Sequence, residues 1–537
     1  YIDTLYKLPY TNSILPIIGI LLTVFVVKKF LDGSIEKGTS QIMIAVAKRS
    51  GYMPRKQMYA QIITSSLTVG MGGSAGLESP ITITGAAFGS NFAQNFRFNY
   101  KDRTLLLACG VASGIAAAFN APIAGVLFAI EVILADMSVT AFIPLMISSA
   151  TGAITSAVIL KENILLNFKE QFTFDYTNTF YYVLLGIIAG LFSLYHARMF
   201  RRIELYTHAI KLSPYKKALV GASILALLIF LFPTLFGEGY ESIKALANNK
   251  ARTILDNTLI EKFKDNKWIV LAFVTATLFI KSIATGLTLG SGGNGGNFAP
   301  ALFAGSYLGF VVAKFFELVG FKELPIANFT VVGMAGMLSG LFHAPLTAIF
   351  LIAEITGGYG LMVPLLIVSS ISFAISKQYD KYSMDIFNIA DKGLVFTSDK
   401  DKNILNKIEL HNIYQFKVAS LNVNASMFDV KEFFLTSKQT FIPVVDDMNM
   451  VVGILQLNKM RALLFNDFKL RSTTIPLEMD EAITASLSEN TGNVIKLMDD
   501  HQLSEIILTQ NNVLVGYVTK VKVLEVYREN LKNLRIE

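Results

Sequence analysis

The chain has 537 residues, of which 53% are hydrophobic and 16% charged, with a mean hydropathy of +0.50. Soluble domains usually carry about 25% charged residues, so this composition excludes an ordinary soluble protein and indicates an integral, multi-pass membrane protein. The net charge of +7 fits loops beside anionic lipid and does not suggest nucleic-acid binding, and the single Cys109 excludes a disulfide framework or a cysteine-rich metal site.

Apolar segments recur along the first 395 residues. Several are shorter than the ~20 residues that a spanning helix needs, or are interrupted by glycine and proline. Such segments are tolerated at membrane depth only where they pack inside protein or line a polar cavity. The pattern favours a channel or transporter. Because residue 1 is tyrosine and not methionine, we expect the native N-terminus to be missing. The main apolar segments are residues 13–27, 180–195, 218–236, 268–290 and 361–375.

The stretch GGSAGLESP (72–80) places one carboxylate, Glu78, among glycines, a serine and a proline in an otherwise uncharged run. A second stretch, GGNGGNFAP (292–300), has glycines at matching positions and ends in the same proline. Glycines let backbone amides approach a ligand closely, and proline suits the first turn of a helix. Two such helix starts directed at one point would bind an anion. The alternative explanation of the glycines is tight helix packing by small residues.

A second pair of segments repeats in the same order, FNAPIAGVLFAIEV (119–132) and FHAPLTAIFLIAEI (342–355), with Glu131 matching Glu354. Duplicated halves with interrupted segments at matching positions indicate a transport site at the repeat interface. Because the acid recurs in both halves, we interpret Glu131 as a structural helix residue.

At these residues the chain resembles the CLC family of chloride channels and transporters. GGSAGLESP is similar to the family's G(K/R)EGP motif, GGNFAP (295–300) to its GxFxP motif, and VASGIAAAFNAPIAGVLFAIEV (111–132) to its most recognisable helix pair. The resemblance covers roughly residues 12 to 395. It implies a mainly α-helical polytopic homodimer in the lipid bilayer, built as an inverted internal repeat of broken and tilted helices, with an anion pathway in each subunit.

The resemblance assigns Glu78 as the gating glutamate, a tethered anion that competes with chloride or a similar anion. Without the resemblance, an acid at a helix start would be read as dipole compensation worth ~0.3–1 kcal/mol. In a membrane, however, an ionisable residue is a functional hypothesis by default. The residues carried over as anion-binding are Lys37, Gly38, Thr39, Gly76, Leu77, Asn297, Phe298 and Ala299.

The chain departs from the family pattern at the inner side of the pathway. Counting back from Glu78, the family's GSGIP motif falls on IEKGTSQIM (35–43) and puts Lys37 in place of the serine. Similarly, KYSMDIFNIADKG (381–393) resembles SIYxxxLxxxG and puts Asp385 at the inner tyrosine, with Tyr382 one turn earlier. Tyr382 and Asp385 are the inner-gate candidates. A Lys37–Asp385 ion pair is one hypothesis, anion concentration by Lys37 at the intracellular mouth is another, and a solvated loop lysine is a third.

A further departure concerns proton coupling. Family members that exchange chloride for protons commonly carry an inner glutamate directly after the position of Glu131, where this chain has Val132. Valine cannot pass on a proton, so the resemblance favours passive conduction over antiport.

From Gln415 the composition becomes that of a soluble domain. Residues 420–464 and 475–527 each show a strand, a helix and two short β-rich runs around a polar turn. They resemble a pair of CBS domains, an α/β module, which we place at 415–470 and 471–537. The Asp that binds ribose in such pairs is replaced by Lys459 and Lys522, which favours a structural or dimer-bracing role over binding of an adenine nucleotide.

Three functions follow. The first is a chloride-selective channel gated by Glu78, without catalytic residues, metal or cofactor, in the plasma membrane with its CBS pair in the cytoplasm. The second is a chloride/proton antiporter. The third is a transport-inactive membrane sensor that uses the CBS pair, against which the retained Glu78 and the two helix starts count.

Overall fold

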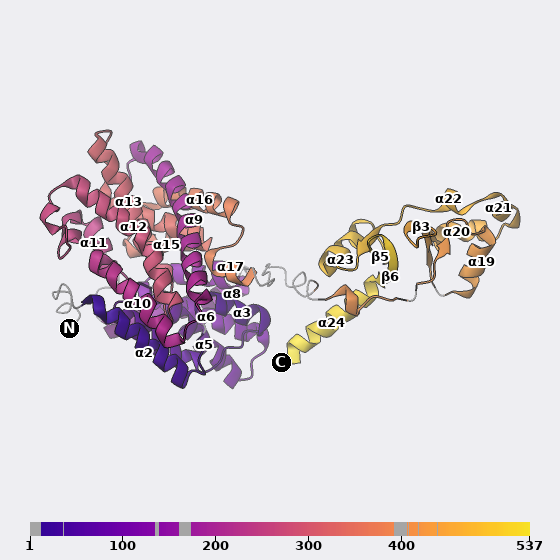
Figure 1. The fold of residues 1–537 in the computed structure, drawn as a ribbon, viewed down its shortest axis with the longest axis horizontal. Coiled ribbons are helices and arrows are strands. Elements are labelled where there is room, and N and C mark those ends of the chain that lie inside the picture. The colour runs from indigo at the N-terminus through magenta and orange to yellow at the C-terminus, as the bar shows by residue number, and fades with distance from the viewer. Residues whose placement is uncertain are drawn as a thin grey trace. The chain divides into compact units, whose positions relative to one another are not determined.

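The structure is a computed structural model that describes residues 12–35, 37–134, 139–160, 173–390, 405, 408–416, 418–437 and 439–536. Two compact units divide the chain, Tyr1–Val395 and Phe396–Glu537. The described part of the first unit is helical, and both β-sheets belong to the second unit (Figure 1).

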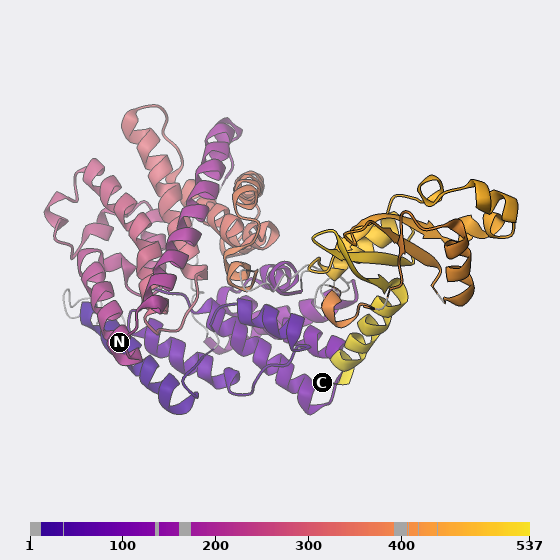
Figure 2. The ribbon, with the colours of Figure 1, turned by 45° about the vertical axis from the view of Figure 1, so that its right-hand side comes forward.

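The first unit is a bundle of helices of unequal length, inclined to one another and not parallel (Figure 2). This is the predicted fold class of broken and tilted helices. Its helices are α2 (Leu15–Phe30), α3 (Ser40–Lys48), α4 (Gln57–Gly70), α5 (Glu78–Asn95), α6 (Tyr100–Phe119), α7 (Pro122–Phe128), the π-helix η2 (Ala129–Leu134), α8 (Val139–Leu160), α9 (Thr179–Ala209), α10 (Pro214–Leu231), α11 (Tyr240–Ala247), α12 (Lys267–Gly290), α13 (Phe298–Val319), α14 (Ile326–Phe342), α15 (Pro345–Ile355), α16 (Met362–Tyr379) and α17 (Met384–Ala390).

Eight helical segments among the described residues are long and apolar enough to cross a membrane. Three shorter apolar helical segments, Pro122–Leu134, Ile326–Phe342 and Pro345–Ile355, lie between them. A segment shorter than the ~20 residues needed for a full crossing has to pack within protein. In keeping with this, every residue of α14 except Ala327 is buried. The multi-pass membrane prediction is confirmed.

The two halves use the same device to pack consecutive helices. In the first half, a Cβ added at Gly85 of α5 would lie 2.2 Å from the carbonyl oxygen of Gly110 in α6. In the second half, a Cβ at Gly305 of α13 would lie 2.5 Å from the carbonyl oxygen of Gly333 in α14. Small residues that let helix backbones approach are typical of membrane-helix interfaces. The helix that follows each glycine-rich loop is thereby locked against its successor.

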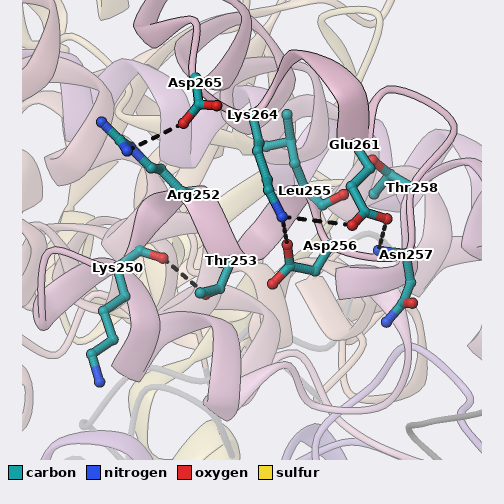
Figure 3. Close-up of polar contacts among 10 residues, drawn as sticks. All are labelled: Lys250, Arg252, Thr253, Leu255, Asp256, Asn257, Thr258, Glu261, Lys264 and Asp265. Carbon is teal, nitrogen blue, oxygen red and sulfur yellow. Dashed lines mark hydrogen bonds and ion pairs between the residues drawn. The ribbon is translucent and has the colours of Figure 1, made fainter.

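The connection between α11 and α12 is held by charged and polar contacts (Figure 3). Lys264 pairs with Asp256 at 3.1 Å and with Glu261 at 3.6 Å, and Arg252 pairs with Asp265 at 3.2 Å. These side chains are largely exposed, so each pair adds only a little stability. Hydrogen bonding and the charge of Asp256 raise the pKa of Lys264 above its usual value.

The second unit consists of two similar three-stranded sheets. In each sheet the first strand pairs in parallel with the second, and the second pairs antiparallel with the third. A side-chain capping box at Ser426 begins α19. The first set contains β1 (Leu421–Asn422), α19 (Met427–Thr436), β2 (Phe441–Val445), β3 (Val451–Gln456), α20 (Leu457–Leu464), α21 (Asp467–Ser472) and α22 (Ile475–Glu478); the second contains β4 (Thr484–Ser486), α23 (Thr491–Asp500), β5 (Glu505–Gln510), β6 (Val513–Thr519) and α24 (Lys520–Ile536).

The repeated strand–helix–strand–strand order is the one predicted for a CBS pair, and it is compatible with that module. Each set encloses its own apolar core. One core is centred on Val430, Ile442 and Leu455, and the other on Val494, Leu508 and Val518. The predicted boundaries at 415–470 and 471–537 stay a prediction.

Candidate functional site

The two glycine-rich loops meet in the interior of the first unit. Gly76 and Gly296 form an antiparallel bridge, in which each amide donates to the other's carbonyl oxygen at 2.9 and 2.8 Å. The helices that follow, α5 and α13, therefore begin beside each other. Neither start is capped by the side chain of its N-cap residue, Leu77 or Asn297. Their first-turn amides are thus left for other partners.

Glu78, the first residue of α5, joins the two helix starts. Its side chain is buried, with 2% of its surface exposed. One carboxylate oxygen accepts a hydrogen bond from the hydroxyl of Tyr240, and the other accepts one from the amide of Ala299 at 3.3 Å. The carboxylate folds back over Gly76, where an added Cβ would lie only 2.1 Å from Oε2 of Glu78. Only a glycine at that position leaves room for this conformation.

The segment from Gly237 to Tyr240 is a part of the site that the sequence analysis missed. The amide of Gly237 donates to the carbonyl oxygen of Gly72 at 3.0 Å. The carboxylate of Glu238 accepts a hydrogen bond from the amide of Leu77 at 3.0 Å. The sequence carried a signal here, because GEGYE (237–241) places an acid between two glycines next to an apolar run, and Glu78 likewise follows a glycine-rich stretch, GGSAGL (72–77).

Lys281 was also missed, although it interrupts the apolar run at 268–290. It lies in α12 with 0% of its surface exposed. Its ammonium group donates to the hydroxyl of Ser74 at 2.9 Å and to the carbonyl oxygen of Gly237 at 3.2 Å, and it lies 4.7 Å from the ring centroid of Phe303. An intramembrane lysine is by default a candidate functional residue, and this one links the glycine-rich loop to the segment that contains Glu238.

The predicted anion-binding residues of the second repeat lie at the start of α13. The ring of Phe298 packs among Phe119, Phe128 and Phe342, with centroid distances of 5.7, 6.0 and 5.6 Å. The ring is therefore a packing element that fixes the helix start. Among the described residues, the side-chain oxygen of Asn297 is buried without a hydrogen-bond partner.

The inner candidates meet in an arrangement that differs from the Lys37–Asp385 pair considered from the sequence. The ammonium group of Lys37 donates to the carbonyl oxygen of Leu289 at 3.1 Å, near the C-terminus of α12, where a helix dipole favours a cation. The hydroxyl of Thr39, the N-cap residue of α3, donates instead to the carboxylate of Asp385.

The hypothesis of a direct Lys37–Asp385 ion pair is therefore wrong in this structure. The backbone turns at Gly38, whose φ of +75° lies in the left-handed region, and sends the two flanking side chains to different partners. Exchanging the two charges is accordingly not expected to rescue the single mutants. Tyr382 is half-buried under the Lys381 ammonium group, which lies 5.6 Å from the ring centroid.

An apolar cluster packs against residues next to Glu78 and Asp385. Its buried members are Val69, Ala75, Phe200 and Leu289, and Leu77 and Met384 pack against them. Leu77 precedes Glu78 and Met384 precedes Asp385. The cluster therefore packs against the residue before each of these two acids.

The acids of the second repeat pair cap each other's helices. Glu131 accepts hydrogen bonds from the amides of Leu346 and Thr347 at the start of α15, at 3.1 and 2.7 Å. Glu354 accepts from the amides of Ile123 and Ala124 at the start of α7, at 3.0 and 2.9 Å. This geometry agrees with the structural role inferred for Glu131.

Val132 lies beside Glu131 in the π-helix η2 and is buried. It offers no titratable group at the position where the resemblance implies proton coupling.

The lysines at the predicted nucleotide positions of the second unit have carboxylate partners. Lys459 pairs with Asp480 at 2.7 Å, and Lys522 approaches Glu525 at 3.5 Å. Both pairs are partly exposed, so their ammonium groups remain accessible to solvent.

Comparison with known proteins agrees with this architecture. The family model described as "Voltage gated chloride channel" matches residues 19–377. The chain is 30% identical over 326 residues to the voltage-gated ClC-type chloride channel ClcB of Citrobacter koseri, an alignment that covers 59% of this chain and 72% of the relative.

Two solved structures are similar in fold. One, a slow cyanobacterial Cl⁻/H⁺ antiporter, has a TM-score of 0.60 and 21% identity, covering 72% of this chain and 88% of the other. The other, a eukaryotic CLC transporter, has a TM-score of 0.60 and 19% identity, covering 95% of this chain and 89% of the other. At these identities the likeness concerns the fold alone.

Proposed function

The chain belongs to the voltage-gated chloride channel family, and from this premise we propose that it conducts chloride or a similar anion passively across a membrane, with Glu78 as the gate. The observation that carries the proposal is the position of the Glu78 carboxylate. The carboxylate accepts a hydrogen bond from the amide of Ala299 at the start of α13, whereas the backbone of Glu78 is the start of α5. Helix N-termini with free amides favour anions.

Gating follows from competition for these amides. While the carboxylate of Glu78 accepts hydrogen bonds from Ala299 and Tyr240, it occupies the position that a free anion would take. An anion gains these donors only after the side chain has rotated away or has lost its charge. Because each contact is a single hydrogen bond, binding stays weak enough to permit release, which conduction requires.

The buried Val132 supports passive conduction over proton-coupled exchange, because it supplies no group to accept a proton. The relative from Citrobacter koseri also carries the name of a chloride channel. We assign the inner end of the pathway to Lys37, Thr39 and Asp385, with Thr39 and Asp385 as a hydrogen-bonded pair that would have to separate or be bypassed for an anion to pass.

Anion/proton antiport is the second candidate, and Glu238 is the observation that favours it. This carboxylate accepts from the amide of Leu77, the residue before Glu78, and so brings a second acid to the gate from another part of the chain. An acid at this place could accept the proton that Val132 cannot.

For the molecular setting we propose a homodimer in the plasma membrane with the second unit in the cytoplasm. The resemblance to CBS pairs supports a bracing role for that unit. The carboxylate partners of Lys459 and Lys522 would compete with a nucleotide phosphate, which supports a role without a bound nucleotide.

Reconstitution of the purified protein into liposomes tests the proposal. An outward chloride gradient should drive chloride efflux without moving protons uphill. Stoichiometric proton uptake would establish the antiporter, and the absence of flux for chloride, bromide, nitrate and fluoride would contradict anion transport altogether.

A further inference from the structure

Glu78 is one of three charged side chains gathered at the gate. The second is Glu238, which is partly buried and bonded to the amide of Leu77 at 3.0 Å. The third is the fully buried Lys281, which donates to Ser74 and to Gly237. Two further titratable groups face the site: the hydroxyl of Tyr240 donates to Glu78, and the buried imidazole of His196 lies beside Lys281 and Asn297.

Several hydrogen bonds hold residues 237–238 against the glycine-rich loop at residues 72–77. The backbone of Gly237 bonds to Gly72, the side chain of Glu238 bonds to the amide of Leu77, and Lys281 joins Ser74 of the loop to Gly237 of the segment. Glu238, which precedes α11, is therefore held beside the backbone at the start of α5. A shift of this segment would move the gate with it.

We propose that Glu238 is a second acid of the gate: it positions the Leu77–Glu78 backbone, and its negative charge, balanced by Lys281, sets how strongly the pathway holds an anion. This inference rests on the proposed anion transport and adds to it a residue and a fixed cation. Glu78 is the mobile competitor, whereas Glu238 and Lys281 are held in place by hydrogen bonds to Leu77, Ser74 and Gly237.

The signs of the charges at the site determine whether a substitution raises or lowers the affinity for an anion. Two acids and one ammonium group surround the helix starts, and burial makes an uncompensated charge costly. Removing the charge of Glu238 leaves the positive charge of Lys281 uncompensated and strengthens anion binding. Removing the charge of Lys281 does the reverse. For a charge ~10 Å from the anion in a medium of effective dielectric constant ~20, the change in affinity is roughly tenfold.

A purely structural role for Glu238 predicts a different pattern. Glutamine keeps an oxygen that can accept from the Leu77 amide, whereas alanine does not. If Glu238 only anchors the backbone, Glu238→Gln behaves as wild type and Glu238→Ala is impaired. If its charge matters, Glu238→Gln already changes the affinity.

The experiment is calorimetric titration of the purified full-length protein with sodium chloride, with sodium fluoride in a parallel series. The variants are Glu238→Gln, Lys281→Met and their combination. Glu241→Gln is the matched control, because Glu241 is exposed and pairs with Lys244 at 3.0 Å on the surface. Thermal melting shows which variants are folded.

We expect Glu238→Gln to bind chloride about tenfold more tightly and Lys281→Met about tenfold more weakly. The double variant should return close to wild type, and Glu241→Gln should not differ from it. An unchanged affinity in folded Glu238→Gln overturns the inference, even if Lys281→Met fails to fold. Failure of the wild-type protein to bind or transport either anion would instead contradict the proposed function.

Discussion

The reciprocal capping of α7 and α15 gives a stability prediction that follows from the repeat. Both helices begin with proline, and their N-cap residues are Ala121 and Ala344, which have no oxygen in their side chains. The orphan amides of each first turn are instead bonded by an acid from the other repeat, Glu354 or Glu131. Replacing either acid by alanine should destabilise both the helix start and the contact between the repeats.

The number of hydrogen bonds that each acid accepts determines which substitution lowers the stability more. Glu131 accepts three, two from amides and one from the Thr347 hydroxyl at 2.6 Å, whereas Glu354 accepts two. At roughly 1.5 kcal/mol for each bond to a charged group, Glu131→Ala should cost about 4.5 kcal/mol and Glu354→Ala about 3 kcal/mol. Glu131→Gln keeps one acceptor oxygen and should cost about half as much as Glu131→Ala.

Thermal unfolding in detergent, followed by the loss of the native gel-filtration peak, checks this order. Glu323→Ala is the control, because Glu323 is exposed between α13 and α14. Hydrogen exchange should also rise first at the two helix starts. The reasoning is refuted if the variants of Glu131 and Glu354 unfold at the same temperature as Glu323→Ala, or if the order of the two alanine variants is reversed.

Three further predictions follow. Gly76→Ala should displace the gating carboxylate, because the new Cβ would lie 2.1 Å from its Oε2, and should also block the proposed anion position, because the Cβ would lie 3.0 Å from the amide of Ala299. Anion efflux should therefore fall several-fold, whereas Gly70→Ala, with open space around the added Cβ, should leave efflux unchanged. Thr39→Val and Asp385→Ala should be non-additive in anion efflux, because each removes the same hydrogen bond; simple additivity would contradict their pairing. Ser426→Ala removes the capping box of α19 and should lower its local stability by about 1 kcal/mol, measured as faster hydrogen exchange over residues 427–436 relative to residues 491–500.

The sequence was most informative where the same residues occur at matching positions in both halves of the repeat. Glycines before a helix with proline in its first turn occur in both halves, and in the structure Gly76 and Gly296 form the bridge between the two loops. The duplicated Glu131 and Glu354 likewise became a reciprocal pair. In these cases the two halves need the same backbone conformation and the same contact at matching positions. The role of a residue in one half can therefore be inferred from its counterpart in the other half.

The sequence was less informative where a contact depends on the direction of a side chain. Lys37 and Thr39 are two residues apart, and position alone did not show that Thr39 reaches Asp385 while Lys37 reaches α12. Glu238 and Lys281 were missed because no repeat partner drew attention to them. Their approach to the gate is set by long-range packing, which spacing along the chain does not reveal.

The pH dependence of chloride efflux from liposomes, compared between the wild-type protein and Glu78→Gln, tests the central claim most directly. Glutamine keeps the shape of the side chain but carries no charge to compete with an anion at the amide of Ala299. We predict faster efflux for Glu78→Gln at neutral pH and a much flatter pH profile. An efflux rate and pH profile identical to those of the wild-type protein would contradict the assignment of Glu78 as the gate.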